Sequence, residues 1–145
     1  MTVLGLGHDV VDVVAFNDLL VEPGSRMTRA FSTRERRQCA MRAQGKHDAE
    51  SVHLAARWAG KEAAFKAWCE ALGTRPYPYG LDDVPWAGIE VLDDSRGCPH
   101  IVLAREVEEA WRTSMGGGAG PGEARWHVSL SHDGPVASAV VVIDG

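Results

Sequence analysis

Hydrophobic and polar residues follow one another in patterns that predict short strands and helices in mixed order. Apolar residues and glycines fill residues 2–14, which predicts a buried strand that runs into a turn or bulge near Gly7. The strongest helical pattern covers about residues 49–72, where Gly60 is the one interruption and Gly73 follows as a typical stop. At about 1.5 Å per residue, this helix would be more than about 30 Å long.

The other segments predict shorter elements of the same two kinds. Helices are expected over about residues 16–20, 33–44 and 105–114, and strands over about 88–92, 100–103, 127–131 and 136–143. Ser32 or Thr33 can cap the second of these helices, and Gly45 can end it. The glycine-rich residues 116–122 predict a flexible link. Because helices and antiparallel strands mix without regular β-α-β units or internal repeats, the sequence predicts a single α+β domain over residues 1–145.

Length and composition fit an ordinary globular domain. The 145 residues are 45% hydrophobic and 24% charged, enough to bury a core without disulfides or structural metals. No apolar run approaches the roughly 20 residues of a membrane-spanning helix, and the N-terminus lacks the pattern of a secretory signal. Three widely spaced cysteines without a CxxC pair are typical of idle thiols in a reducing compartment. We therefore expect a cytoplasmic protein with no membrane partner.

Charge is distributed unevenly along the chain. The net charge of −5 argues against general binding of nucleic acid. Residues 25–46 nevertheless hold seven basic side chains and one acidic side chain, a local charge of +6 that leaves −11 for the remainder. Such asymmetry indicates a face that meets an acidic partner, and a solvated helix surface is the alternative interpretation.

Ionisable residues interrupt the apolar face of the long helix. Residues at helical spacing form an apolar stripe about 60° wide, made of Leu54, Trp58, Phe65, Cys69 and Leu72. Lys61 and Glu62 fall on the borders of this stripe, where a charge is costly unless it is paired or liganded. Lys66 lies one turn after Glu62 on the same face. This pattern fits either a plain salt bridge or a carboxylate metal ligand beside an ammonium group for a phosphate.

Two further segments offer candidate ligands. Asp9 follows Gly5-Leu6-Gly7-His8 at the expected end of the first strand, where it can join Glu62 on Mg²⁺, a cation that prefers oxygen ligands. A turn aspartate that caps its own backbone is the alternative, and Asp12 is a weaker candidate. Ser131 and His132 end another strand and offer donors suited to phosphate, unless His132 is simply a satisfied turn histidine. The sequence has no Gly-x-Ser-x-Gly elbow, phosphate loop or His–Cys spacing typical of zinc.

Five short motifs, in order, resemble those of the holo-[acyl-carrier-protein] synthases, the small class of 4′-phosphopantetheinyl transferases, and their actinobacterial branch in particular. The motifs are Gly7-His8-Asp9, Phe31-Ser32-Thr33-Arg34-Glu35, Arg57 to Ala67, Gly97-Cys98-Pro99 and Val128-Ser129-Leu130-Ser131-His132. The resemblance implies a small antiparallel sheet packed on a long central helix. It also implies transfer of the 4′-phosphopantetheine arm of coenzyme A to a serine of an apo acyl carrier protein, with release of 3′,5′-ADP, for fatty-acid synthesis.

The resemblance also assigns roles to residues. It makes Asp9 and Glu62 the ligands of Mg²⁺, and it gives Lys66 the task of neutralising phosphate charge. The general base is either Glu62 itself or a metal-bound water. The residues assigned to coenzyme A are Arg57, Lys61, Pro99, Ser131 and His132.

The resemblance implies partners as well. Acyl carrier proteins are acidic, so the basic segment would dock the carrier, with Arg26, Arg29 and Arg37 as candidate contacts. Members of the small class are homotrimers with sites in the clefts between subunits. The sequence leaves two kinds of carrier open: a discrete acyl carrier protein and a carrier domain of a fatty-acid synthase. Two other classes of function stay open: a non-catalytic module that binds a nucleotide or an acidic partner, and a metal-dependent phosphohydrolase that would consume coenzyme A without a carrier.

Overall fold

The structure is a computed structural model that describes residues 2–116 and 124–145. Its elements are β1 (Val3–Asp12), α1 (Val13–Val21), a 3₁₀ turn at Met27–Ala30, α2 (Thr33–Lys46), α3 (Glu50–Leu72), a 3₁₀ turn at Trp86–Gly88, β2 (Ile89–Asp93), β3 (Pro99–Leu103), α4 (Arg105–Ser114), β4 (Arg125–Asp133) and β5 (Val136–Asp144). This order confirms the predicted α+β class. The predicted link at 116–122 lies, apart from Gly116, outside the described residues. No helix in the described ranges has the length and apolar character needed to cross a membrane.

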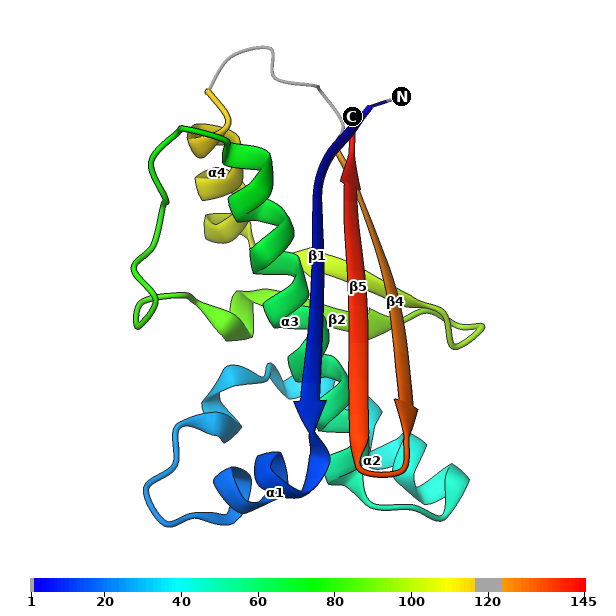
Figure 1. Ribbon diagram of the computed structural model, residues 1–145. Coiled ribbons are helices and arrows are strands. Elements are labelled where there is room, and N and C mark those ends of the chain that lie inside the picture. Colours follow the sequence, from blue (N-terminus) through cyan, green and yellow to red (C-terminus); the bar gives the residue numbers. More distant parts are fainter. Residues whose placement is uncertain (1, 117–123) are drawn as a thin grey trace.

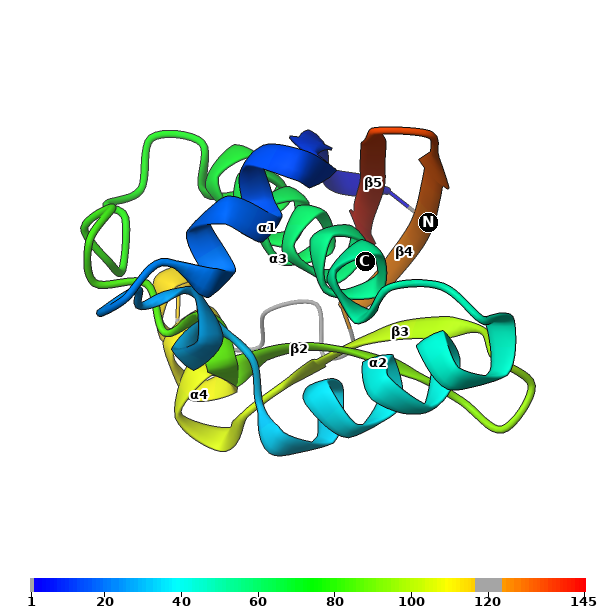
Figure 2. The ribbon, with the colours of Figure 1, turned by 90° about the horizontal axis from the view of Figure 1, so that it is seen from below.

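The long helix α3 lies between two antiparallel layers. On one side is a three-stranded sheet in the order β1-β5-β4, and on the other is the two-stranded hairpin of β2 and β3 (Figure 1). Helix α2 lies beneath the hairpin, as the view from below shows (Figure 2). This arrangement confirms the expected packing of a small antiparallel sheet on a central helix, and it leaves α3 with little exposed surface.

Small residues bring β1 unusually close to α3. A Cβ atom placed on Gly7 would lie 1.8 Å from the carbonyl oxygen of Ala63, and one placed on Gly5 would lie 2.1 Å from that of Ala67. Both contacts are far inside van der Waals range, so only glycine fits at these two positions. The close approach places the side chain of Asp9 directly against α3.

The structure corrects two predictions about β1. The strand does not turn at Gly7 but continues to Asp12, and its irregularity lies between Val3 and Gly5. Asp9 is therefore within the strand, opposite Ala139 of β5, and not at a strand end. The glycines that suggested a turn serve close packing instead.

The predicted end of α2 and the predicted buried face of α3 also need correction. Helix α2 runs through Gly45 and ends at Lys46, and the next residue, His47, caps it in the left-handed conformation with φ of 56°. The single apolar stripe predicted for α3 is wrong, because the opposite face is buried as well. That face carries alanines such as Ala59, Ala63 and Ala67, which are fully buried. Alanine contributes little to a hydrophobic pattern, so the sequence concealed this second contact.

A pair of glycine substitutions tests the close packing of β1. We expect Gly7→Ala to lower the free energy of unfolding by about 3 kcal/mol or more, because its methyl group would collide with rigid backbone. Gly45→Ala is the control, since its Cβ would meet nothing within 4 Å and lies inside a helix. It should leave stability unchanged or raise it by up to about 1 kcal/mol. Urea unfolding followed by circular dichroism measures both, and equal effects would contradict the packing account.

Candidate active site

A carboxylate pair and an ammonium group meet where β1 crosses α3. Lys66 donates hydrogen bonds to Oδ1 of Asp9 at 2.9 Å and to the carbonyl oxygen of His8 at 3.0 Å. Lys66 therefore bonds across to β1, and the plain Glu62–Lys66 salt bridge is not its main contact. Glu62 lies close to both Asp9 and Lys66, and its pKa responds to them: Asp9 raises it and Lys66 lowers it. The structure thus brings together three residues singled out from the sequence.

The two carboxyl groups are poorly satisfied without a cation. Burial, together with hydrogen bonding and charge from Asp9, raises the pKa of Glu62 to about 8. While Glu62 is ionised, the buried Oδ2 of Asp9 has no hydrogen-bond donor among the described residues. A buried carboxylate oxygen without a partner is costly unless a proton or a metal ion completes it. The oxygen donors of this pair therefore fit a hard divalent cation such as Mg²⁺.

A hollow of about 310 Å³ opens between α3, β4 and the β2–β3 hairpin. Its lining includes Arg57, Pro99, Ser131 and His132 from the sequence-based set, together with Arg42, Lys46, His53, Ala56, Asp93, Gly97 and Leu130. Three of these side chains are cations and one is an anion. Positive charge in a concave surface favours an anionic ligand such as a phosphate.

Arg57 is held in this pocket with part of its hydrogen-bonding capacity unused. Its Nη2 donates to Oδ2 of Asp93 at 2.8 Å, and Arg42 pairs with the same carboxylate oxygen. The Nε of Arg57 is buried and has no partner among the residues that the structure describes. Because an unpartnered buried donor costs free energy, this atom favours an acceptor that enters the pocket.

His53, which lies one helical turn before Arg57, was not among the residues singled out from the sequence. Its side chain is only 3% exposed, and its Nε2 lies 2.6 Å from Oδ1 of Asp48. The His53 ring meets that of His132 edge to face at 5.9 Å between centroids. The spacing of His53 and Arg57 at i and i+4 was the available signal, since such residues share a helix face.

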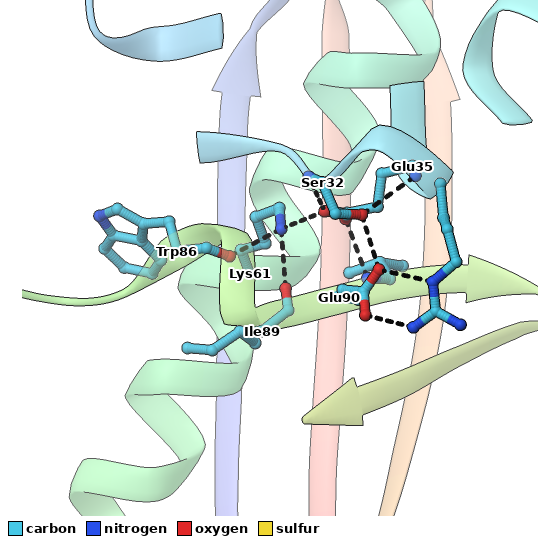
Figure 3. Close-up of polar contacts among 8 residues, drawn as sticks. Ser32, Glu35, Lys61, Trp86, Ile89 and Glu90 are labelled. Carbon is cyan, nitrogen blue, oxygen red and sulfur yellow. Dashed lines mark hydrogen bonds and ion pairs between the residues drawn. The ribbon is translucent and has the colours of Figure 1, made fainter. Parts of the chain in front are cut away.

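Lys61 does not join either group, which corrects its assignment to coenzyme A. Its side chain is fully buried, and its Nζ donates to Oε1 of Glu35 at 2.6 Å and to the carbonyl oxygens of Trp86 and Ile89 at 2.8 Å each (Figure 3). An ammonium group has three donors, so all of them are committed to protein oxygens. Burial lowers the pKa of Lys61, although Glu35 opposes this effect. The residue therefore holds the fold together next to the site.

Glu35 is the partner that makes this arrangement possible. One oxygen accepts from the backbone nitrogen of Ser32 at 3.0 Å, completing a capping box for α2, and the other accepts from the backbone nitrogen of Val91 at 2.9 Å. Glu35 and Lys61 thus tie together α2, α3 and β2, as the converging dashed lines of Figure 3 show. This network fixes the hairpin that forms one wall of the pocket.

We expect Lys61→Met to lower the free energy of unfolding by about 3–5 kcal/mol, because it leaves the fully buried carboxylate of Glu35 without its charged partner. The double variant Lys61→Met/Glu35→Leu removes both charges and should recover part of this loss. Chemical unfolding of the two variants measures the difference. A single variant as stable as the parent would contradict the structural role of Lys61.

Comparison with known proteins bears directly on this site. The family model of the 4′-phosphopantetheinyl transferase superfamily matches residues 5–131, which contain the carboxylate pair and every pocket-lining residue except His132. The chain belongs to this superfamily. It is 56% identical over 144 residues to the holo-[acyl-carrier-protein] synthase of Bifidobacterium animalis subsp. lactis, covering 97% of each protein. It is 39% identical over 140 residues to that of Corynebacterium efficiens, covering 97% of this chain and 93% of the relative.

Solved structures of the family have the same fold. The Chronobacterium ammoniagenes ACPS-CoA complex superposes with a TM-score of 0.84 and 34% identity, covering 99% of this chain and 97% of that one. Acyl carrier protein synthase from Mycobacterium tuberculosis gives a TM-score of 0.69 at 28% identity, covering 99% and 98%. The resemblance deduced from five motifs is therefore confirmed, including its actinobacterial character.

Proposed function

We propose that this protein is a holo-[acyl-carrier-protein] synthase. It transfers the 4′-phosphopantetheine group from coenzyme A to a serine of an apo acyl carrier protein, or of a carrier domain, and releases 3′,5′-ADP for fatty-acid synthesis. The observation that carries the proposal is the pair Asp9 and Glu62 with Lys66 beside it, set in a chain that is 56% identical to a named synthase. The nucleophile belongs to the carrier, so the chain itself needs no catalytic triad.

The carboxylate pair would hold Mg²⁺. The orphaned Oδ2 of Asp9 and the half-buried carboxyl group of Glu62 supply the oxygen donors that this ion prefers. When bound, the ion would supply positive charge against the pyrophosphate of coenzyme A. Lys66 contributes further positive charge from its position on Asp9. Because phosphoryl transfer depends mainly on positioning and charge stabilisation, these groups suit the reaction.

The pocket would hold the nucleotide end of coenzyme A. Arg57 offers its unpartnered Nε to a phosphate oxygen, and Ser131 and His132 offer further donors from β4. Pro99 forms part of the wall. Arg42 and Lys46 add positive charge, so the pocket matches the phosphates of the nucleotide and leaves the reactive arm free to extend outward.

The geometry of α3 supports sites shared between subunits. Arg57 and Glu62 are five residues apart, so they point about 140° away from each other around the helix. In one protomer the pocket therefore faces away from the carboxylate pair, and one coenzyme A molecule would reach both groups if neighbouring protomers supplied them. This agrees with the homotrimer expected from the resemblance.

The outer face of the three-stranded sheet is the proposed trimer interface. It carries exposed apolar side chains, including Leu6 at 50%, Val10 at 57% and Val140 at 39% exposure. Exposed apolar patches of this kind mark association surfaces. Sedimentation should give about three times the chain mass of 15.6 kDa, and Val10→Arg should yield monomers without transfer activity. A fully active monomer would refute the shared site.

The acidic carrier would dock on the basic segment. Arg26, Arg29 and Arg37 are exposed, whereas Arg34 and Arg42 are already paired with Glu90 and Asp93. Free surface charges of this kind raise the rate of association more than they raise affinity. We further propose that the protein acts in the cytoplasm, where its three free cysteines suit a reducing environment.

Formation of 3′,5′-ADP with and without an apo carrier tests this function against its rivals. The product should appear only when coenzyme A, Mg²⁺ and the apo carrier are all present. Product without a carrier would indicate a phosphohydrolase. No product with either a discrete carrier or a synthase-derived carrier domain would indicate a binding module.

A further inference from the structure

The β2–β3 hairpin gathers three side chains that the reaction does not use. The turn is closed by hydrogen bonds from the backbone nitrogen of Asp94 to the carbonyl of Cys98 at 2.9 Å and from Gly97 to the carbonyl of Asp94 at 3.0 Å. Gly97 has a φ of 80°, which only glycine adopts readily. This tight turn sets Asp94 across from Cys98, and the Asp94 side chain reaches His100, which pairs with Leu92 in the hairpin. It projects at the right edge of Figure 2.

Each of the three residues turns one metal-binding atom toward the others. The Oδ1 of Asp94 accepts hydrogen bonds from the backbone nitrogens of Arg96 at 2.8 Å and Cys98 at 3.0 Å, which fixes its carboxylate. The other oxygen, Oδ2, lies 2.9 Å from Nε2 of His100. The ligand atoms of Asp94, Cys98 and His100 all lie within 4.8 Å of one another, and all three residues are exposed.

The donor set selects a particular class of cation. A thiolate, an imidazole and a carboxylate together suit Zn²⁺, whereas Mg²⁺ favours oxygen ligands alone. Around a tetrahedral zinc ion, neighbouring ligand atoms lie about 3.3–3.8 Å apart, given bonds of roughly 2.0–2.3 Å. The ligand atoms of Asp94, Cys98 and His100, which lie within 4.8 Å of one another, reach this spacing with shifts of no more than about 1.5 Å, which exposed side chains can make. The metal then replaces the proton that Asp94 and His100 share.

We propose that Asp94, Cys98 and His100 form a binding site for Zn²⁺ at the tip of the β2–β3 hairpin. Three protein ligands leave the fourth position open to water or another ligand. The site is separate from the pair Asp9 and Glu62, which offers only oxygen. The sequence did not reveal this site, because Cys98 and His100 do not have a spacing typical of zinc ligands. The third ligand, Asp94, comes close to them only through the turn.

Titration of the full-length protein with Co²⁺ tests the site, because thiolate-bound cobalt gives an intense near-ultraviolet charge-transfer band. The parent protein should bind one Co²⁺ with this band, and one equivalent of Zn²⁺ should abolish it, while millimolar Mg²⁺ should not. Cys98→Ser should remove the band. His100→Gln should weaken binding at least about 10- to 100-fold, since changes to the outer partners of metal ligands already have effects of this size.

Two controls separate this site from others in the chain. Cys69→Ser removes a half-buried thiol elsewhere and should leave the band intact. Asp9→Asn alters the proposed Mg²⁺ site and should leave it intact as well. The proposal is overturned if the parent shows no charge-transfer band, if the band survives in Cys98→Ser, or if Cys69→Ser abolishes it. The first of these results would mean that Asp94 and His100 form only an ion pair.

Discussion

Asp9→Asn and Glu62→Gln should each lower the rate of phosphopantetheine transfer by at least about 10³-fold, the largest effects expected in this protein. Each replaces one of the two carboxylates that the structure offers to a divalent cation at this site with a neutral amide, which is a weaker ligand. A metal ion contributes several kcal/mol of charge stabilisation to such a reaction, and each 1.36 kcal/mol corresponds to about a factor of ten. Steady-state rates with saturating coenzyme A and apo carrier measure the loss.

The stability of these variants provides the control. The pKa of Glu62 decides whether removing its charge raises or lowers the free energy of unfolding. Because this pKa rises from 4.5 to about 8 on folding, the native state binds more protons than the unfolded state between these values. Stability from this group is therefore present at low pH and is lost as the pH rises through 8. In EDTA at about pH 8, Glu62→Gln should have a free energy of unfolding about 1–2 kcal/mol higher than the parent, after allowance for solvent screening. Urea unfolding measures the difference. A less stable or fully active Glu62→Gln variant would contradict the assignment.

Lys66→Ala should lower kcat for transfer by about 10²–10³-fold while changing the Kd for coenzyme A less than about threefold. The ammonium group of Lys66 donates hydrogen bonds to Asp9 and to the carbonyl oxygen of His8, on the opposite side of α3 from the pocket. Its charge therefore acts where the phosphoryl group moves, not where the nucleotide is held.

Lys46→Ala is the matched control, because it removes the same charge from the pocket lining. This variant should show the reverse pattern, with coenzyme A bound about tenfold more weakly and kcat little changed, as expected for loss of a surface ion pair in a concave site. Calorimetry with coenzyme A and single-turnover kinetics separate the two parameters. If Lys66→Ala weakens binding as much as it slows transfer, Lys66 has only a binding role.

The sequence was informative where residue type and spacing act locally. Ser32, one of the two N-cap candidates, marks the start of α2, and Gly73 marks the end of α3, because both signals depend on neighbouring backbone groups. The hairpin of β2 and β3 follows in the same way from two short apolar runs around a turn. These features need no knowledge of distant contacts.

The sequence was misleading where distant segments pack together. Gly7 resembled a turn residue, yet it is a strand residue against the backbone of Ala63. Lys61 resembled a ligand-binding residue, because its partner Glu35 lies 26 positions earlier and no local pattern joins the two. His53 was overlooked, because its meeting with His132 depends on how β4 packs against α3.

The candidate site followed largely from the motifs, but its geometry did not. Asp9, Glu62 and Lys66 were chosen from the sequence, and the structure brings them together. The spacing of Arg57 and Glu62 already turns them about 140° apart around the helix. That a pocket forms on the Arg57 side could not be foreseen without the placement of the β2–β3 hairpin. The pairing of a reaction centre with a nucleotide pocket is thus a property of the packed layers and, in our proposal, of neighbouring subunits.

Intact mass of an apo acyl carrier protein, incubated with this protein, coenzyme A and Mg²⁺, tests the central claim most directly. The carrier should gain the mass of one phosphopantetheine group, and EDTA or the Glu62→Gln variant should prevent the gain. A gain that persists in EDTA would contradict the metal site at Asp9 and Glu62. No gain on a discrete carrier or on a synthase-derived carrier domain, with the protein folded, would contradict the transferase itself.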